Sequence, residues 1–158
     1  MATIRPIRPS DAEGLLAVWR ETWPATYGPT LGAAAVAAML HSLDEGVAAM
    51  LPPGTSDGFC AVDSGVVVAT AIHSVGRPVV HLWGVYVRPD RQGQGLGKGL
   101  MDAVRRAAGT APIECRVVER SEGVVKFYRA LGFRIVGEEA TTILRGVAEP
   151  CLVMRLGA

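Results

Sequence analysis

The pattern of apolar and polar residues opens with a strand and continues with two helices. Residues 3–8 alternate as a half-exposed strand does. Ser-Asp-Ala-Glu at 10–13 has the spacing of a capping box, and the helix that follows has an apolar face with two tryptophans. Pro24 marks the end of this helix or a kink in it. A second helix, rich in alanine, is expected over 31–42.

The middle of the chain, after the break at Pro-Pro-Gly, has the pattern of three consecutive strands. They are expected over 59–62, 66–75 and 79–87. Asp-Ser-Gly at 63–65 and Gly-Arg-Pro at 76–78 supply the turns between them. Connections this short favour an antiparallel meander.

The last third alternates helices with strands. Helices are expected over 97–108 and 121–131, and strands over 113–118, 133–144 and 151–156. Gly132 suits the position after a helix end. Because a helix precedes the strand at 113–118, that strand should lie parallel to 79–87. The order β-α-α-β-β-β-α-β-α-β-β predicts one α+β domain with a mixed sheet over residues 1–158.

Composition favours a packed globule over a disordered chain. Of 158 residues, 49 % are hydrophobic and 20 % are charged, and a formal net charge of +1 gives no general attraction to nucleic acid or to a membrane. No apolar run approaches the roughly 18 residues of a membrane span, so a cytoplasmic protein is expected. Cys60, Cys115 and Cys151 are far apart without a CxxC motif, which indicates buried packing, and no metal site is expected.

Glycine stands at every second position from 93 to 99, between a strand and a helix. The first N–H groups of a helix have no partner within it and concentrate positive charge, so an anion fits there. Glycines at 93, 95 and 97 let the backbone come close to ligand oxygens, and Gln92, Gln94 and Lys98 add donors. The pattern favours a phosphate site over a connection that binds nothing.

Two other phosphate motifs do not fit this segment. A dinucleotide fingerprint would need glycine at position 98 or 100, where Lys98 and Leu100 stand. A nucleoside-triphosphate loop would need glycine at 92 and a hydroxyl residue at 99, where Gln92 and Gly99 stand. Neither an NAD site nor a Mg-nucleotide site is supported.

Charge is distributed unevenly along the chain. Residues 86–106 hold five basic and two acidic side chains, which suits an anionic ligand. Residues 21–76 hold no Lys or Arg and five acids: Glu21, Asp44, Glu45, Asp57 and Asp63. That half could favour a cationic acceptor such as an amine, although ordinary turn and helix-end acids explain the same pattern.

Two segments together resemble the GNAT superfamily of acetyl-CoA-dependent N-acetyltransferases. Gln-Gly-Gln-Gly-Leu-Gly at 92–97 is similar to its Gln/Arg-x-x-Gly-x-Gly segment. About 30 residues further on, 121–133 is similar to its Asn-x-x-Ala-x-x-Phe-Tyr-x-x-x-Gly-Phe segment, with Ser121 in place of Asn. The predicted order of elements is also that of the GNAT fold, so the resemblance covers nearly the whole chain.

The resemblance implies a coenzyme A site across the strands at 79–87 and 113–118, which splay apart in this fold. The main-chain N–H near Val85 would bind the thioester oxygen. The residues expected to hold the cofactor are Val85, Tyr86, Val87, Gln92, Gly93, Gln94, Gly95, Leu96, Gly97, Lys98 and Ser121.

The resemblance also implies catalytic roles. Tyr128 has the position of the general acid, with a packed aromatic residue as the alternative. His81 has the position of the general base, with a structural histidine as an equal alternative. Strand alternation would place His81 on the side of Trp83, Val85 and Val87. His73 and Glu119 are reserves for the base.

The segment that covers the acceptor site in this family contains Trp23, Tyr27 and the loop 28–30. They are substrate candidates, although core packing explains them as well. The sequence therefore predicts transfer of acetyl from acetyl-CoA to a primary amine of a small molecule or peptide, in a ternary complex without a covalent intermediate. The alternative is an acyl-CoA-binding sensor or scaffold without turnover, and the resemblance is compatible with a homodimer.

Overall fold

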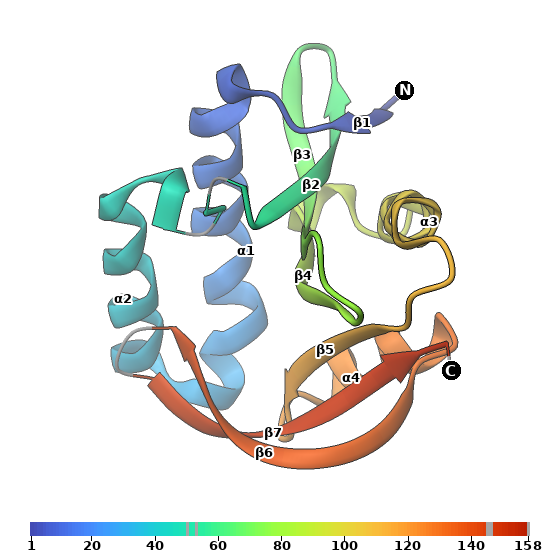
Figure 1. Cartoon of the computed structure of the whole chain (residues 1–158). Coiled ribbons are helices and arrows are strands. Elements are labelled where there is room, and N and C mark those ends of the chain that lie inside the picture. Colours follow the sequence, from blue (N-terminus) through green and yellow to red (C-terminus); the bar gives the residue numbers. More distant parts are fainter. Residues whose placement is uncertain (50, 53, 145–146, 158) are drawn as a thin grey trace.

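In the computed structural model, which describes residues 1–49, 51–52, 54–144 and 147–157, a seven-stranded sheet has helices on both faces (Figure 1). The strands are β1 (Thr3–Pro6), β2 (Ser56–Asp63), β3 (Val66–Ser74), β4 (Val80–Val87), β5 (Ile113–Val118), β6 (Arg134–Leu144) and β7 (Val147–Leu156). The helices are α1 (Ala12–Leu31), α2 (Ala33–Ser42), α3 (Leu96–Ala108) and α4 (Glu122–Ala130). The mixed α+β architecture and the element order match the prediction.

The strand order is β1-β2-β3-β4-β5-β7-β6, and β4 and β5 form the parallel pair. The other neighbouring strands are antiparallel. The ladder between β4 and β5 contains the pairs Val80–Ile113, His81–Glu114 and Leu82–Cys115. Beyond these pairs the two strands diverge, as the resemblance predicted. Their facing edges are therefore free of each other over the rest of their length.

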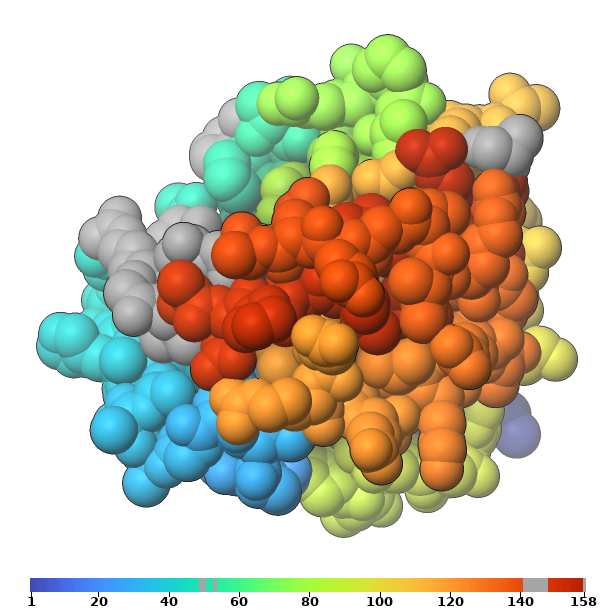
Figure 2. Space-filling model, turned by 90° about the horizontal axis from the view of Figure 1, so that it is seen from below, coloured from blue at the N-terminus to red at the C-terminus, as the bar shows by residue number. Residues whose placement is uncertain are grey.

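Each face of the sheet has its own core. On one face, Trp19 and Leu15 of α1 and Met39 of α2 pack against strand residues such as Ile72. The indole N–H of Trp19 donates to Thr70 Oγ1 at 3.0 Å inside this core. On the other face, α3 and α4 cover the sheet with a larger cluster. Seen from below, the described parts of β6 and β7, in orange and red, lie across the middle of the molecular surface (Figure 2). The two layers fix α1 and α4 on opposite sides of the divergence between β4 and β5.

Helix α1 does not end or break at Pro24. It continues through Pro24 and Pro29 to Leu31 and ends at Gly32, which has φ +85°. Each proline lacks the N–H that would bond four residues back, which disfavours a helix interior. The burial of Trp19 and Trp23 against the sheet offsets that cost.

The capping box expected at 10–13 is absent, because the start of α1 has no side-chain cap. Asp11 instead accepts the Arg8 backbone N–H at 2.7 Å and two N–H groups of Arg5 at 2.8 and 2.9 Å. The hydrogen bonds from Arg5 lower the pKa of Asp11 to about 2. Charge pairing with Arg5 thus replaces the predicted local motif and ties α1 to β1.

None of the helices in the described part of the chain combines the length and the apolar run that a membrane crossing would need.

Candidate active site

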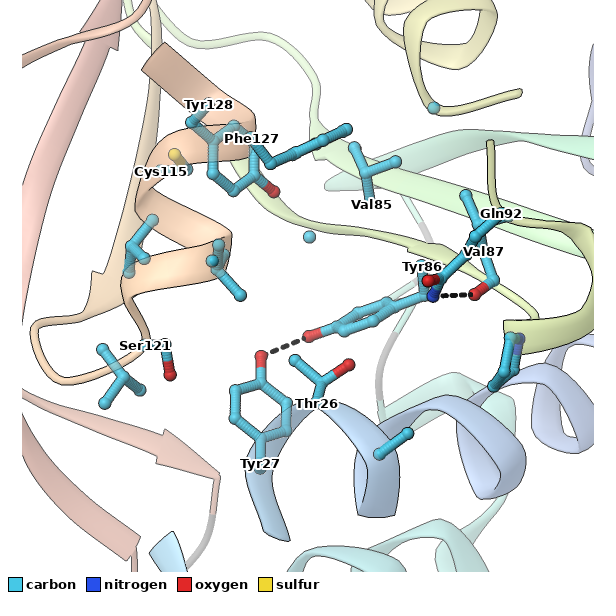
Figure 3. A pocket seen from close by; sticks show the side chains of 18 of the residues that line it. Thr26, Tyr27, Val85, Tyr86, Val87, Gln92, Cys115, Ser121, Phe127 and Tyr128 are labelled. Carbon is cyan, nitrogen blue, oxygen red and sulfur yellow. Dashed lines mark hydrogen bonds between the residues drawn. The ribbon is translucent and has the colours of Figure 1, made fainter. Parts of the chain in front are cut away.

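The divergence of β4 and β5 opens a cavity of about 760 Å³ that runs through the sheet (Figure 3). Residues 83–87 of β4 and 115–118 of β5 form two of its walls. The loop before α3, the first turn of α3, most of α4 and the end of α1 complete the lining. The strands thus supply unpaired backbone, and three helices supply side chains, around a single space.

A bulge in β4 changes which side chains face the cavity. Ile72 of β3 pairs with Gly84, but the next residue, His73, pairs with Leu82, so Trp83 is an extra residue. Leu82 and Val85 consequently lie on the same face of the sheet, against α3. His81 lies on the opposite face, so the expectation that it shares a side with Val85 and Val87 is wrong. Alternation along a strand holds only while the register is unbroken.

The glycine loop has the geometry of an anion site. Gly93 and Gly95 have φ of +79° and +80°, and a Cβ at either position would meet nothing within 4 Å. Gly95 is the residue that precedes α3, so the first N–H groups of the helix face the end of the cavity. Gly97 also lines the cavity, and its lack of a side chain has a second use. It is helical, and a Cβ there would lie 3.0 Å from the Phe127 ring, so it allows close packing of α3 on α4.

Polar side chains of the same loop flank this end of the cavity. Gln92 donates to the Val87 carbonyl at 3.2 Å, which fastens the loop to the end of β4 (Figure 3). Lys98 is exposed and lines the cavity, whereas Gln94 is exposed and is not part of the lining. The predicted phosphate residues other than Gln94 therefore gather at one end of the cavity, with Leu96 buried beneath them.

Tyr128 of α4 has its hydroxyl directed into the cavity, near Cys115 and Val85 (Figure 3). The side chain is 4 % exposed and packs edge-on against Phe127 and Phe133. Burial raises its pKa well above the ordinary value, and the backbone of Val85 has a smaller, opposite effect. At neutral pH this phenol holds its proton and can donate it.

Two further tyrosines close the α1 side of the cavity. The hydroxyls of Tyr27 and Tyr86 are 2.9 Å apart, and burial raises the pKa of both (Figure 3). Trp23, predicted with Tyr27 as a substrate residue, is not in the lining. It is 1 % exposed, stacks on Trp19 and meets Tyr86 edge-on. Tyr27 therefore lines the cavity, whereas Trp23 lies outside it and packs against the ring of Tyr86.

The end of α1 touches the start of α4 across the opening. Thr30 Oγ1 lies 3.3 Å from Ser121 Oγ, and both residues line the cavity. Ser121 is 5 % exposed and precedes the first residue of α4. The serine that replaces asparagine in the motif therefore makes a contact to α1.

His81 lies beside the cavity and does not form part of its lining. Its Nδ1 is 3.0 Å from Arg116 Nη1. A guanidinium can only donate, so Nδ1 accepts and the neutral ring carries its proton on Nε2. Burial and, next, the charge of Arg116 lower the pKa of His81. The histidine is therefore neutral at pH 7, but its acceptor nitrogen is occupied.

The reserve candidates for a base lie elsewhere. His73 is buried, stacks on Phe59, and its Nδ1 is 2.9 Å from the Ser74 carbonyl oxygen. Glu119 is exposed at the end of β5. Neither residue lines the cavity.

Several lining residues were missed as site residues in the sequence, and three of them matter for the chemistry of the cavity. Cys115, expected to serve packing, lies in the wall beside Tyr128, and burial raises the pKa of its thiol to about 12. Trp83 is 47 % exposed at the bulge. Arg116 directly follows Cys115, the last residue of β5 that pairs with β4. The bulge follows from the pairing of β4 with β3, so the sequence of β4 alone offered no signal for it.

The acids of residues 21–76 do not gather at the cavity. Glu21 pairs with Arg88 at 3.0 Å, Asp44 with His41 at 3.1 Å, and Asp63 with Arg91. None of the five acids belongs to the lining, whose acidic member is Glu122. The reading of these acids as ordinary surface residues fits the structure better than an acidic acceptor region.

Comparisons with known proteins place the chain among acetyltransferases. Residues 15–133 match the model of the acetyltransferase (GNAT) family. The chain is 30 % identical over 141 residues to the peptidyl-lysine N-acetyltransferase YjaB of Salmonella typhimurium, covering 87 % of this chain and 86 % of that protein. It is 31 % identical over 96 residues to the thialysine N-epsilon-acetyltransferase of Sus scrofa, covering 58 % and 56 %.

Solved structures share the fold at lower identity. The PaiA N-acetyltransferase of Thermoplasma acidophilum in complex with coenzyme A has a TM-score of 0.77 at 18 % identity, covering 100 % of this chain and 99 % of that one. A GCN5-related N-acetyltransferase structure from Rhodopseudomonas palustris has a TM-score of 0.81 at 20 % identity, covering 100 % and 96 %.

Proposed function

The chain belongs to the GNAT acetyltransferase family, and we propose that it transfers acetyl from acetyl-CoA directly to a primary amine of a small molecule or peptide. The observation that carries this proposal is the position of Tyr128. Its protonated hydroxyl lies in the cavity beside the free backbone of β4, where a departing thiolate would need a proton.

The cavity fits coenzyme A in its shape and in its donors. Gly93 and Gly95 leave open a cradle at the start of α3, which Lys98 flanks, and this end suits a pyrophosphate. The unpaired edge of β4 from Trp83 to Val87 suits the amides of pantetheine. When bound, acetyl-CoA supplies an activated acyl group as a thioester.

Val85 and Tyr128 have different proposed roles at the thioester. The backbone N–H of Val85 donates to the oxyanion, an interaction worth about 2.7 to 4 kcal/mol in such sites. Tyr128 protonates the sulfur as it leaves, because a phenol releases its proton to a thiolate that is forming beside it.

The state of Cys115 supports direct transfer over an acetyl-cysteine intermediate. This thiol lies beside Tyr128, close enough to the proposed reaction centre to be considered as a nucleophile. With a pKa of about 12, only about one thiol in 10⁵ would be ionised at pH 7. The amine of the acceptor is then the nucleophile itself.

We propose that the proton of the amine passes to water, because Arg116 Nη1 occupies Nδ1 of His81 and His81 does not line the cavity. His81 is the alternative general base, and it would need Nδ1 to be free of Arg116.

Steady-state kinetics with acetyl-CoA and a panel of amines, peptides included, test the proposal. We expect thiol release that depends on the amine, intersecting initial-velocity lines, and an acetylated amine by mass spectrometry. Cys115→Ala should retain the activity. Parallel lines with an acetyl group on Cys115 would refute direct transfer, and tight acetyl-CoA binding without turnover of any amine would favour a sensor or scaffold.

A further inference from the structure

Charged side chains form a cluster on the sheet face opposite α3 and α4, where β4 and β5 begin to diverge. Glu114 is 8 % exposed and accepts from Arg155 Nε at 2.8 Å and from Arg116 Nη1 at 3.3 Å. Arg116 Nε also donates to Glu139 at 2.9 Å. With the contact to His81, Arg116 is held by three elements of the sheet. Its planar group therefore has one fixed orientation.

The donors of Arg116 are not all used. Nε–H goes to Glu139, and the two hydrogens of Nη1 go to Glu114 and His81. Among the described residues, nothing accepts from Nη2, so two of the five N–H groups remain available. Arg116 lies in the lining of the cavity. A fixed guanidinium with one free nitrogen is suited to bind an oxygen of a ligand.

The surroundings favour an anionic oxygen over a neutral one. Arg116, Arg77 and Arg155 face two carboxylates, Glu114 and Glu139, in and around the cluster. After burial, the largest influence on the pKa of His81 is the charge of Arg116, and it lowers the pKa. Three arginines against two carboxylates leave the cluster with a net charge of +1.

The position of Trp83 and the distance along β4 between His81 and Val85 indicate how long the ligand must be. The half-exposed indole lines the cavity one residue beyond the last pair between β4 and β5. The guanidinium reaches His81, four residues before Val85, which in a strand corresponds to a separation on the order of 10 Å. A ligand that joins both points needs a carbon chain of several bonds.

We propose that Arg116 Nη2 binds a carboxylate of the amine acceptor, so that the acceptor is an ω-amino acid whose chain packs on Trp83. This inference rests on the proposed acetyl transfer near Val85. A carboxylate site at Arg116 would favour a free ω-amino acid over a lysine within a peptide, because the backbone of such a lysine has an amide where the free acid has its carboxylate.

The test compares 6-aminohexanoate with 6-aminohexanamide, which differs in the carboxylate alone. We expect kcat/KM to be at least about 10-fold higher for the acid, through KM, and shorter acids such as 4-aminobutanoate to lose this advantage. Arg116→Gln should raise KM for the acid to that for the amide while KM for acetyl-CoA stays the same. Trp83→Ala should raise KM for both probes alike.

Arg155→Gln is the matched control, because it removes a second arginine from Glu114 but not a cavity donor. It should keep the preference for the acid. Equal KM values for acid and amide in the wild type, or a preference that survives in Arg116→Gln, would overturn the carboxylate site and leave acetyl transfer intact. Failure to acetylate any amine in the wider panel would overturn both.

Discussion

At the scale of single residues, the proposed catalytic role rests on one hydroxyl, that of Tyr128. Tyr128 is enclosed by Phe127, Phe133 and the wall of β5, and its burial keeps the phenol protonated. A proton that is held firmly in the resting state can still be given to a thiolate that forms in contact with it. The role of Tyr128 is therefore local and should be removable without changing the fold.

Tyr128→Phe should lower kcat by a factor on the order of 10² with little change in KM for acetyl-CoA. The ring contacts to Phe127 and Phe133 remain, so the thermal unfolding midpoint should stay close to that of the wild type. The measurement is amine-dependent thiol release with saturating and limiting acetyl-CoA. Unchanged turnover would remove Tyr128 from the mechanism.

The protonation of His81 depends on charged neighbours on β5, on β6 and in the segment that precedes β4. Burial, Arg116 and Arg77 lower its pKa, while Glu114 and Glu139 raise it. Arg116→Gln should therefore raise the pKa, and Glu139→Gln should lower it further. The imidazole proton resonances of His81, followed through a pH titration, report both shifts.

If His81 is the base, the acid limb of the pH–rate profile must follow its pKa. A lowered pKa keeps the imidazole neutral to lower pH, so the wild-type limb lies below the ordinary histidine range. Arg116→Gln should shift that limb upwards, and His81→Ala should abolish it. A profile that keeps its shape in His81→Ala would assign the proton to water.

At the scale of elements, the loop that precedes α3 combines backbone strain with an open space. Gly95→Ala would place a side chain at φ +80°, which costs about 1 kcal/mol even though nothing lies within 4 Å. The same change would narrow the predicted pyrophosphate site. We expect a small loss of thermal stability and a much larger loss of coenzyme A affinity by calorimetry.

Gly109→Ala provides the control at the opposite end of the same helix. Gly109 also has positive φ, +63°, and open space around it, but it lies outside the cavity lining. It should lose stability and keep its affinity for coenzyme A. Equal losses of affinity in the two variants would mean that Gly95 acts through helix stability alone.

The elements differ in how far the sequence could predict them. The glycine loop and the helix from 122 to 130 carry local signals, and both lie at the cavity as expected. The bulge at Trp83 depends on the register with β3, which no pattern within β4 reveals. The continuation of α1 past Pro24 depends on burial of Trp19 and Trp23 in the tertiary core. Local chemistry was therefore predictable, and pairing between distant segments was not.

The same limit applies to the polar side chains of the site. His81 was chosen from its place in a strand, but its state depends on Arg116, which lies 35 positions further along the chain. Arg116 in turn depends on Glu139 of β6. Such contacts between strands that are distant in sequence decide which nitrogen carries a proton, and composition contains no trace of them.

At the scale of the molecule, two parts meet along the short ladder of β4 and β5 and in the core that α3 and α4 share. Strands β1 to β4 with α1 to α3 form one part, and β5 to β7 with α4 form the other (Figure 1). Three residue pairs join β4 to β5, and the Thr30–Ser121 contact joins the two parts at the opening of the cavity. A ligand in the cavity would touch both parts at once.

Acetyl-CoA should therefore stabilise the whole molecule and not just the glycine loop. At about 100 times its Kd, a ligand that binds the folded state adds about 2.7 kcal/mol to the free energy of unfolding. Acetyl-CoA should raise the unfolding midpoint accordingly, and NAD and ATP at equal concentration should not, since neither of their motifs is present. Hydrogen exchange should slow at the start of α3 and also at the start of α4, which lie on opposite sides of the divide. Protection confined to α3, or an equal shift with ATP, would mean that the loop binds a phosphate without a ligand crossing between β4 and β5.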